Sequence, residues 1–249
     1  MLTVAVYNIK GGVGKTTTAV NLAFLAATEG RRTLVWDLDP QGAASFYFRV
    51  KAQIKGGHKQ IFKGGDHLLE RVRETDYPGL DLLPADFALR HLDLELEQKN
   101  KPTSRIRKVL RALRTEYDLV ILDCPPSISL LSEAVFEAAD LLLVPTIPTT
   151  LSLRTLAQLA RFRKEQGLKH LRILPFFSMV DRRKNMHRQI LELHSREKTR
   201  FLRTTIPYAS EVEQMGLHQQ PLPVFASRRS PSVEAYHQLW LELKTSLDS

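Results

Sequence analysis

The feature that most constrains this chain is a glycine-rich segment near its start, residues 10–17, which reads KGGVGKTT. An apolar, β-branched run at residues 3–8 precedes it, and residues 16–29 follow with small and apolar side chains at helical spacing. Glycines allow a tight turn whose backbone N–H groups point inward, and a helix N-terminus adds its positive dipole end. The pattern therefore predicts a phosphate-binding loop between a strand and a helix.

The side chains of this loop suit a nucleoside triphosphate. The Lys15 ammonium is expected to neutralise β- and γ-phosphate oxygens, and the Thr16 hydroxyl to ligate magnesium. A glycine-rich turn without a ligand is the alternative, but glycines, lysine, hydroxyl, strand and helix all coincide here. The expected nucleotide-binding residues of the loop are Gly11, Gly12, Val13, Gly14, Lys15, Thr16 and Thr17.

Short apolar runs alternate with longer amphipathic stretches along the chain, a pattern typical of a parallel sheet with helices on its faces. The expected strands cover residues 3–8, 33–38, 80–83, 119–122, 141–144, 172–176 and 204–206. The expected helices cover residues 16–29, 152–165, 185–197 and 232–247. We therefore expect an α/β P-loop NTPase with a mostly parallel central sheet and helices on both faces. No repeat or linker divides the chain, so residues 1–249 are expected to form a single domain.

Two further predicted strands end in carboxylates. Residues 37–42 read DLDPQG, and alternation along a strand would place Asp37 and Asp39 on one side of it. A plain strand-end turn is the alternative for this segment. Residues 119–126 read LVILDCPP, so Asp123 emerges from a dry strand and is expected to hold a hydrated magnesium ion. Ligands of open α/β sheets bind at this edge, which places these carboxylates beside the phosphate loop.

The lysine at position 10 makes the sequence pattern of this loop more specific than that of a general phosphate-binding loop. KGGVGKTT resembles the deviant Walker A P-loop of the ParA/MinD family of partitioning and positioning ATPases, whose hallmark is KGGxGKTT. The resemblance implies that Lys10 reaches across a nucleotide-sandwiched dimer to the partner's phosphates, as a charge clamp acting in trans. It assigns Asp39 to the attacking water and Asp37 to a magnesium or switch-region role. The implied catalytic residues are Lys10, Lys15 and Asp39.

The resemblance extends over nearly the whole chain, because residues 79–85, 125–127, 144–146, 205–207 and 230–236 also look like segments of that family. It implies ATP as substrate and Mg²⁺ as cofactor. It also implies that Met179 and Pro207 contact the adenine, from the loops after the strands at residues 172–176 and 204–206. The implied metal-binding set is Thr16, Asp37 and Asp123.

The net charge of +9 is concentrated late in the chain, because residues 1–150 carry +1 and residues 151–249 carry +8. Such an asymmetry favours a polyanion as partner. The single cysteine excludes a disulfide framework, a zinc site built on cysteines and a cluster-bridging pair of the nitrogenase iron-protein type. No leader pattern or membrane span is present, so we expect a cytoplasmic protein.

The basic side chains gather at residues 182–203, where a solvated helix face is the ordinary interpretation. The charge asymmetry, the number of arginines and the family's habit of binding DNA non-specifically favour a DNA surface instead. No helix-turn-helix extension precedes the loop, so sequence-specific binding is not expected. The expected DNA-binding residues are Arg182, Arg183, Lys184, Arg188, Arg196, Lys198, Arg200, Arg203, Arg228 and Arg229.

These observations predict an ATPase that binds nucleoid DNA non-specifically as an ATP-bound homodimer and positions a cargo. Slow hydrolysis would be stimulated by a ParB-like or adaptor protein. A MinD-like, membrane-associated positioning ATPase is the main alternative, and a small-molecule kinase or synthetase is another.

Residues 236–249 carry one lysine against two acids, so we expect this helix to pack on the domain without stable membrane association. Residues 49–67, rich in lysine and glycine, are expected to form a surface loop.

Overall fold

The computed structural model describes residues 1–51, 66–85, 103–196 and 201–247. Most of the expected surface loop at residues 49–67 lies outside this part of the chain. So do two of the expected DNA-binding residues, Lys198 and Arg200, and the side chain of Arg196.

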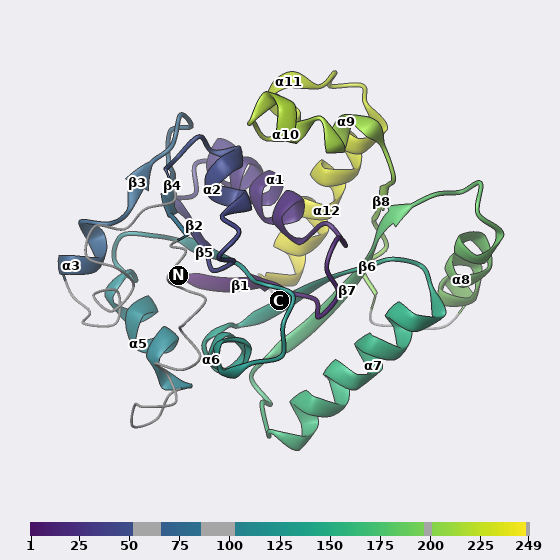
Figure 1. Ribbon diagram of the computed structural model, residues 1–249, viewed down its shortest axis with the longest axis horizontal. Helices are drawn as coiled ribbons and strands as arrows, with labels where there is room; N and C mark the ends of the chain where they lie inside the picture. Colours follow the sequence, from purple (N-terminus) through teal and green to yellow (C-terminus); the bar gives the residue numbers. More distant parts are fainter. Residues whose placement is uncertain (52–65, 86–102, 197–200, 248–249) are drawn as a thin grey trace.

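An eight-stranded sheet forms the centre of the described structure, with the order β3-β4-β2-β5-β1-β6-β7-β8 (Figure 1). All neighbouring strands run parallel except the edge strand β3, which is antiparallel to β4. This confirms the predicted α/β class and every predicted strand, while β3 was not predicted. The strands are β1 (Leu2–Val6), β2 (Thr33–Asp37), β3 (Arg73–Glu74), β4 (Leu80–Leu83), β5 (Leu119–Asp123), β6 (Leu141–Thr146), β7 (Arg172–Val180) and β8 (Thr205–Pro207).

Helices cover both faces of the sheet. Side chains along each strand point to the two faces in alternation, so each face carries its own apolar cluster. Val4 and Val6 of β1 face one core cluster, and Ala5 and Tyr7 face the other. The first face is covered by α1 (Lys15–Thr28), α2 (Ala43–Tyr47), α10 (Met215–His218) and α12 (Pro231–Leu247). The second is covered by α5 (Ser104–Ala112), α6 (Leu130–Ala138) and α7 (Thr150–Glu165). The remaining helices are α3 (Asp66–Leu69), α8 (Asn185–Arg196), α9 (Ser210–Glu213) and α11 (Leu222–Phe225).

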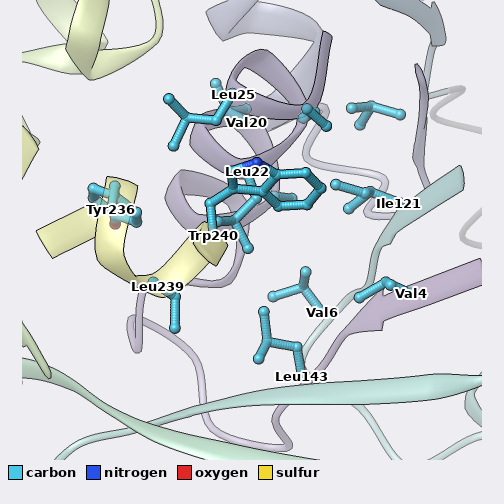
Figure 2. Close-up of a cluster of buried hydrophobic side chains, with 14 of the residues drawn as sticks. Val4, Val6, Val20, Leu22, Leu25, Ile121, Leu143, Tyr236, Leu239 and Trp240 are labelled. Carbon is cyan, nitrogen blue, oxygen red and sulfur yellow. The ribbon is translucent and has the colours of Figure 1, made fainter. Parts of the chain in front are cut away.

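The last helix packs into the core beside the helix that follows the phosphate loop. Figure 2 shows Trp240 of α12 beside Leu22 of α1, and Leu239 of the same helix extending toward the strands. Each is at most 1% exposed, and burial of a side chain of this size stabilises a fold by roughly 1.5–3 kcal/mol. This confirms the predicted packing of the C-terminal helix. Among the described helices, none is long and apolar enough to cross a membrane.

Candidate nucleotide-binding site

The glycine-rich segment leaves the carboxyl end of β1 and enters α1 at Lys15, as predicted. Gly12 and Gly14 adopt φ angles of +66° and +89°, a region that other residues rarely enter. A Cβ on Gly14 would lie 3.1 Å from the Ser178 Oγ, so the loop also depends on the absence of a side chain there. Asn8 anchors the loop, because its Oδ1 accepts from the Lys10 N–H at 2.9 Å and its Nδ2 donates to the Pro145 carbonyl at 2.8 Å.

A cavity of about 360 Å³ opens at this edge of the sheet. It brings together residues predicted from separate parts of the sequence: the loop glycines, Asp39, Met179 and Pro207. The side chain of Val13 is buried and does not line it. The lining residues are Gly11, Gly12, Gly14, Lys15, Thr16, Thr17, Asp39, Ala43, Tyr47, Pro126, Ser178, Met179, Ile206, Pro207, Tyr208, Ala209, Val212, Glu213 and Tyr236.

The Lys15 ammonium is held at the floor of the loop, where its Nζ donates to the Lys10 carbonyl at 3.1 Å. Burial lowers the pKa of Lys15, and the nearby carboxylates of Asp123 and Asp39 act in the opposite direction. A cation held by one neutral acceptor retains donors for an incoming anion. Lys15 is therefore placed to meet phosphate oxygens.

Asp123 ends β5 with a fully buried carboxylate, and neither oxygen has a hydrogen-bond partner among the described residues. Burial raises its pKa well above the usual value, and the neighbouring Asp37 adds to the rise. The Thr16 hydroxyl and the Lys15 ammonium act in the opposite direction on this pKa. An unpaired buried carboxylate is costly, and a divalent cation is the partner that such an oxygen prefers. The pair Thr16 and Asp123 therefore fits a bound magnesium ion.

Asp37 and Asp39 differ in their surroundings more than strand alternation predicts. β2 ends at Asp37, whose buried Oδ2 accepts from the Ser45 N–H at 2.8 Å and from the Ser45 hydroxyl at 2.7 Å. Its Oδ1 accepts from the Asp39 N–H at 3.3 Å, so the chain has already turned and the two-residue period no longer applies. Of these two aspartates, Asp39 lines the cavity and Asp37 does not. These contacts favour the switch-region role for Asp37 over direct ligation of a metal.

Lys10 points away from the cavity in this conformation. Its Nζ donates to the Ser152 Oγ at 3.3 Å, in the first turn of α7. Ser152 also lies 2.8 Å from the Thr149 Oγ1, and Thr149 caps the same helix. The lysine thus rests on its own chain, and it is not among the residues that line the cavity.

The outer wall of the cavity comes from the carboxyl ends of β7 and β8. Met179 has a φ of +54°, which is unusual for a residue with a side chain and marks a constrained backbone. After β8, the Tyr208 hydroxyl donates to the Glu213 Oε1 at 2.9 Å. Sequence reasoning found Met179 and Pro207 but missed Tyr208 and Glu213, for which the chain offers no spacing signal. It also missed Tyr47 and Tyr236.

A hydrogen bond connects the segment after Asp123 to Tyr7, the residue that follows β1. The Tyr7 hydroxyl donates to the Ser127 carbonyl at 2.8 Å, and burial raises the pKa of Tyr7. Pro126, which lies between Asp123 and Ser127 in the sequence, lines the cavity. A shift of this segment would therefore be transmitted to the strand that carries the phosphate loop.

The expected DNA-binding residues that the structure describes are exposed. Arg182, Arg183 and Lys184 form the turn between β7 and α8. Arg183 is paired with Asp181 through bonds of 2.9 and 3.0 Å, which lower the pKa of that carboxyl to about 2. The others are Arg188 on α8, Arg203 before β8, and Arg228 and Arg229 between α11 and α12.

A family model described as an AAA domain (AAA_31) matches residues 1–171. The chain is 31% identical over 248 residues to the sporulation initiation inhibitor protein Soj of Bacillus subtilis, covering 96% of this chain and 97% of that protein. It is 33% identical over 248 residues to the chromosome partitioning protein ParA of Myxococcus xanthus, covering 96% and 87%. A solved structure of cobyrinic acid a,c-diamide synthase from Mycobacterium smegmatis, with bound ADP and magnesium, has a TM-score of 0.82 at 26% identity, covering 100% and 96%.

Both relatives exceed 30% identity over almost the full described fold, and the family model spans the phosphate loop, Asp39 and Asp123. The geometry of the site agrees with a nucleotide and magnesium at the carboxyl edge of the sheet. The chain belongs to the ParA/Soj family of partitioning ATPases.

Proposed function

We propose that this ATPase binds DNA without sequence specificity when it holds ATP, and that it thereby distributes or positions a cargo. One observation carries the proposal. Met179 lines the nucleotide cavity and lies three residues before Arg182, the first of the exposed basic side chains. Because one short segment contacts the cavity and carries the arginines, nucleotide occupancy can alter how the basic turn is presented.

The chain's own groups are assigned as follows. Backbone N–H groups of the loop and the Lys15 ammonium bind the phosphates, and Thr16 and Asp123 hold the magnesium ion. When bound, that ion would neutralise charge on the β- and γ-phosphates. Asp39, which lines the cavity just after the end of β2, orients the attacking water. Tyr208 and Met179 face the base.

Two copies of the chain join when ATP is bound. Lys10 then leaves Ser152 and reaches the triphosphate of the partner copy, where its charge stabilises the transition state in trans. A monomer lacks this cation at its own cavity, so its hydrolysis is slow. A ParB-like or adaptor protein stimulates hydrolysis and returns the protein to the monomer.

The basic turn supplies phosphate contacts without reading bases. Each phosphate that a lysine or arginine neutralises adds roughly 0.9 to the slope of log affinity against log salt. A dimer doubles the number of such contacts and gains affinity by avidity. The protein would then be cytoplasmic and associated with the nucleoid. The membrane-associated alternative is disfavoured, because most apolar side chains of α12 are buried against α1 and the sheet, and Leu241 is its one strongly exposed large apolar residue among the described residues.

Anisotropy of a short labelled duplex tests this function. We expect at least tenfold tighter binding with a non-hydrolysable ATP analogue than with ADP. Arg182→Glu with Arg183→Glu should remove the difference. Arg161→Glu with Lys164→Glu, the same charge change on the exposed face of α7, should preserve it. Equal affinity in the two nucleotide states would refute the gating, and unaltered binding by the first variant would refute the chosen surface.

A further inference from the structure

A second basic surface lies on α5, far from the turn after β7. Its exposed side is formed by arginine and lysine side chains, and residues 104–115 contain no acid. The near-neutral charge of residues 1–150 hides this cluster in the sequence. The five basic residues of the α5 surface are Arg105, Arg107, Lys108, Arg111 and Arg114.

The opposite side of α5 is committed to the core. Ile106, Val109, Leu110 and Leu113 are each at most 3% exposed, and they pack in the cluster that covers the second face of the sheet. At 100° per residue these four positions share one side of the helix, so the basic residues share the other. The apolar side cannot enter a lipid bilayer while the protein is folded, which leaves only the charged side to meet a partner.

The charges on this side have no ion-pair partner among the residues that the structure describes. Within the described part of the chain, none of the five basic side chains makes an ion pair or a hydrogen bond. Glu133 and Glu137 share a cavity with Thr103 before the N-terminus of α5, and the Glu116 Oε1 accepts from the Thr115 hydroxyl after its C-terminus.

The spacing of the arginines suits a linear polyanion. Arg107 and Arg111 lie on α5 and Arg114 lies in the turn that follows it, at intervals of four and three residues, so the three form a stripe about 10 Å long if the turn continues the helical spacing. Duplex DNA carries a charge about every 1.7 Å along its axis, so this stripe spans about six charges. Guanidinium groups match phosphate oxygens, which a compact acidic ligand would not present over this length.

We propose that α5 is a second DNA-binding surface, independent of the turn between β7 and α8, and that it makes each copy of the chain bivalent for DNA. Figure 1 shows α5 and α8 near opposite ends of the long axis of the molecule, with the sheet between them. One duplex lying on α8 therefore leaves α5 accessible to another. The bivalent arrangement rests on the proposed function. Contact of α5 with DNA does not, because it does not require the turn between β7 and α8 to bind DNA.

Two measurements test the proposal on the full chain. The first is the salt dependence of anisotropy with a short labelled duplex. Neutralising two phosphate contacts lowers the slope of log affinity against log salt by about 1.8. We expect this loss for Arg107→Gln with Arg111→Gln. The matched variant Arg161→Gln with Lys164→Gln, on α7, should keep the wild-type slope. Equal slopes for the two variants would overturn the proposal.

The second measurement is capture of a labelled duplex by protein bound to bead-immobilised duplex. We expect at least fivefold less capture with the α5 variant, while its ATP-dependent binding to a single duplex persists. Unchanged capture would overturn the bivalent arrangement. If the proposed function were wrong, the result would be different: the wild type and every variant would bind the duplex with equal affinity in the presence of the ATP analogue and of ADP. Binding to phosphatidylserine vesicles that requires Arg107 and Arg111, with no change in the DNA slope, would assign α5 to a membrane and overturn the DNA proposal.

Discussion

Lys10 and Ser152, 142 residues apart in the chain, meet where the phosphate loop approaches the first turn of α7. The Nζ–Oγ distance of 3.3 Å is that of a hydrogen bond, and it holds the lysine on its own protomer. A lysine that acts in trans must first leave this contact. If the proposed dimer forms in this way, the hydrogen bond stabilises the free protein relative to it.

Ser152→Ala is expected to favour the ATP-bound dimer. A hydrogen bond of this kind contributes about 0.5–1.5 kcal/mol, and each of the two copies loses one, so the dimerisation constant should rise by about fivefold to 150-fold. Light scattering with a non-hydrolysable ATP analogue measures the dimer fraction. Ser195→Ala, whose hydroxyl bonds to its own helix at the Glu192 carbonyl, serves as the control. Weaker dimerisation of Ser152→Ala would contradict the resting role of this contact.

The two lysines of the loop should separate binding from dimerisation. Lys15→Ala removes the cation that lines the cavity, and a lost charge-assisted bond of about 1.5–3 kcal/mol weakens nucleotide binding by at least tenfold. Lys10→Ala should leave nucleotide affinity within about threefold, because among the described residues its Nζ makes a hydrogen bond only to Ser152, yet it should prevent the proposed dimer. Calorimetry and light scattering measure the two effects. A tenfold loss of nucleotide affinity in Lys10→Ala would contradict this division.

The sheet and its carboxyl edge could be predicted because their signals are local. Strands such as β5 are continuous apolar runs, and Asp123 follows from the position at which that run ends. The edge strand β3 consists of two exposed charged residues, so it carries no hydrophobic signal. It exists only because β4 offers an edge for pairing.

The cavity walls were less predictable because packing between distant elements creates them. Tyr236 is fully buried and reaches the cavity only because α12 packs on α1, more than 200 residues earlier in the chain. The resting place of Lys10 likewise depends on where α7 begins. Helix α5 did leave a local signal, since Ile106, Val109, Leu110 and Leu113 follow helical spacing, but it was not among the predicted helices.

Gly14→Ala is expected to disable the loop by two effects. An alanine at a φ of +89° costs about 1–2 kcal/mol, and its Cβ would lie 3.1 Å from the Ser178 Oγ. Gly167→Ala is the matched control, because its φ of +65° imposes strain while its Cβ would meet nothing within 4 Å. Both variants should lose stability in urea denaturation, and only Gly14→Ala should lose nucleotide binding. Equal nucleotide affinity of the two variants would show that the loop tolerates the added atom.

Stability should depend on pH through the buried carboxyl of Asp37. Burial is the main cause that raises its pKa from 3.8 to about 6, so the folded protein retains a proton there that the unfolded chain releases. This group therefore destabilises the fold increasingly as pH rises from about 4 to 6, by up to about 3 kcal/mol above that window. Asn at position 37 avoids the buried charge and retains an oxygen acceptor for Ser45.

We therefore expect Asp37→Asn to be more stable than the wild type by about 1–3 kcal/mol above pH 7, and to differ little near pH 4. Urea denaturation at the two pH values measures this. Asp118→Asn is a control of opposite sign. Hydrogen bonds from Arg32 lower the pKa of Asp118, so its stabilisation is present above the unfolded pKa and is lost as pH falls. That variant should be the less stable one above pH 7. If Asp37→Asn showed no gain there, the Asp37 carboxylate would have to be stabilised by its Ser45 donors more than burial destabilises it.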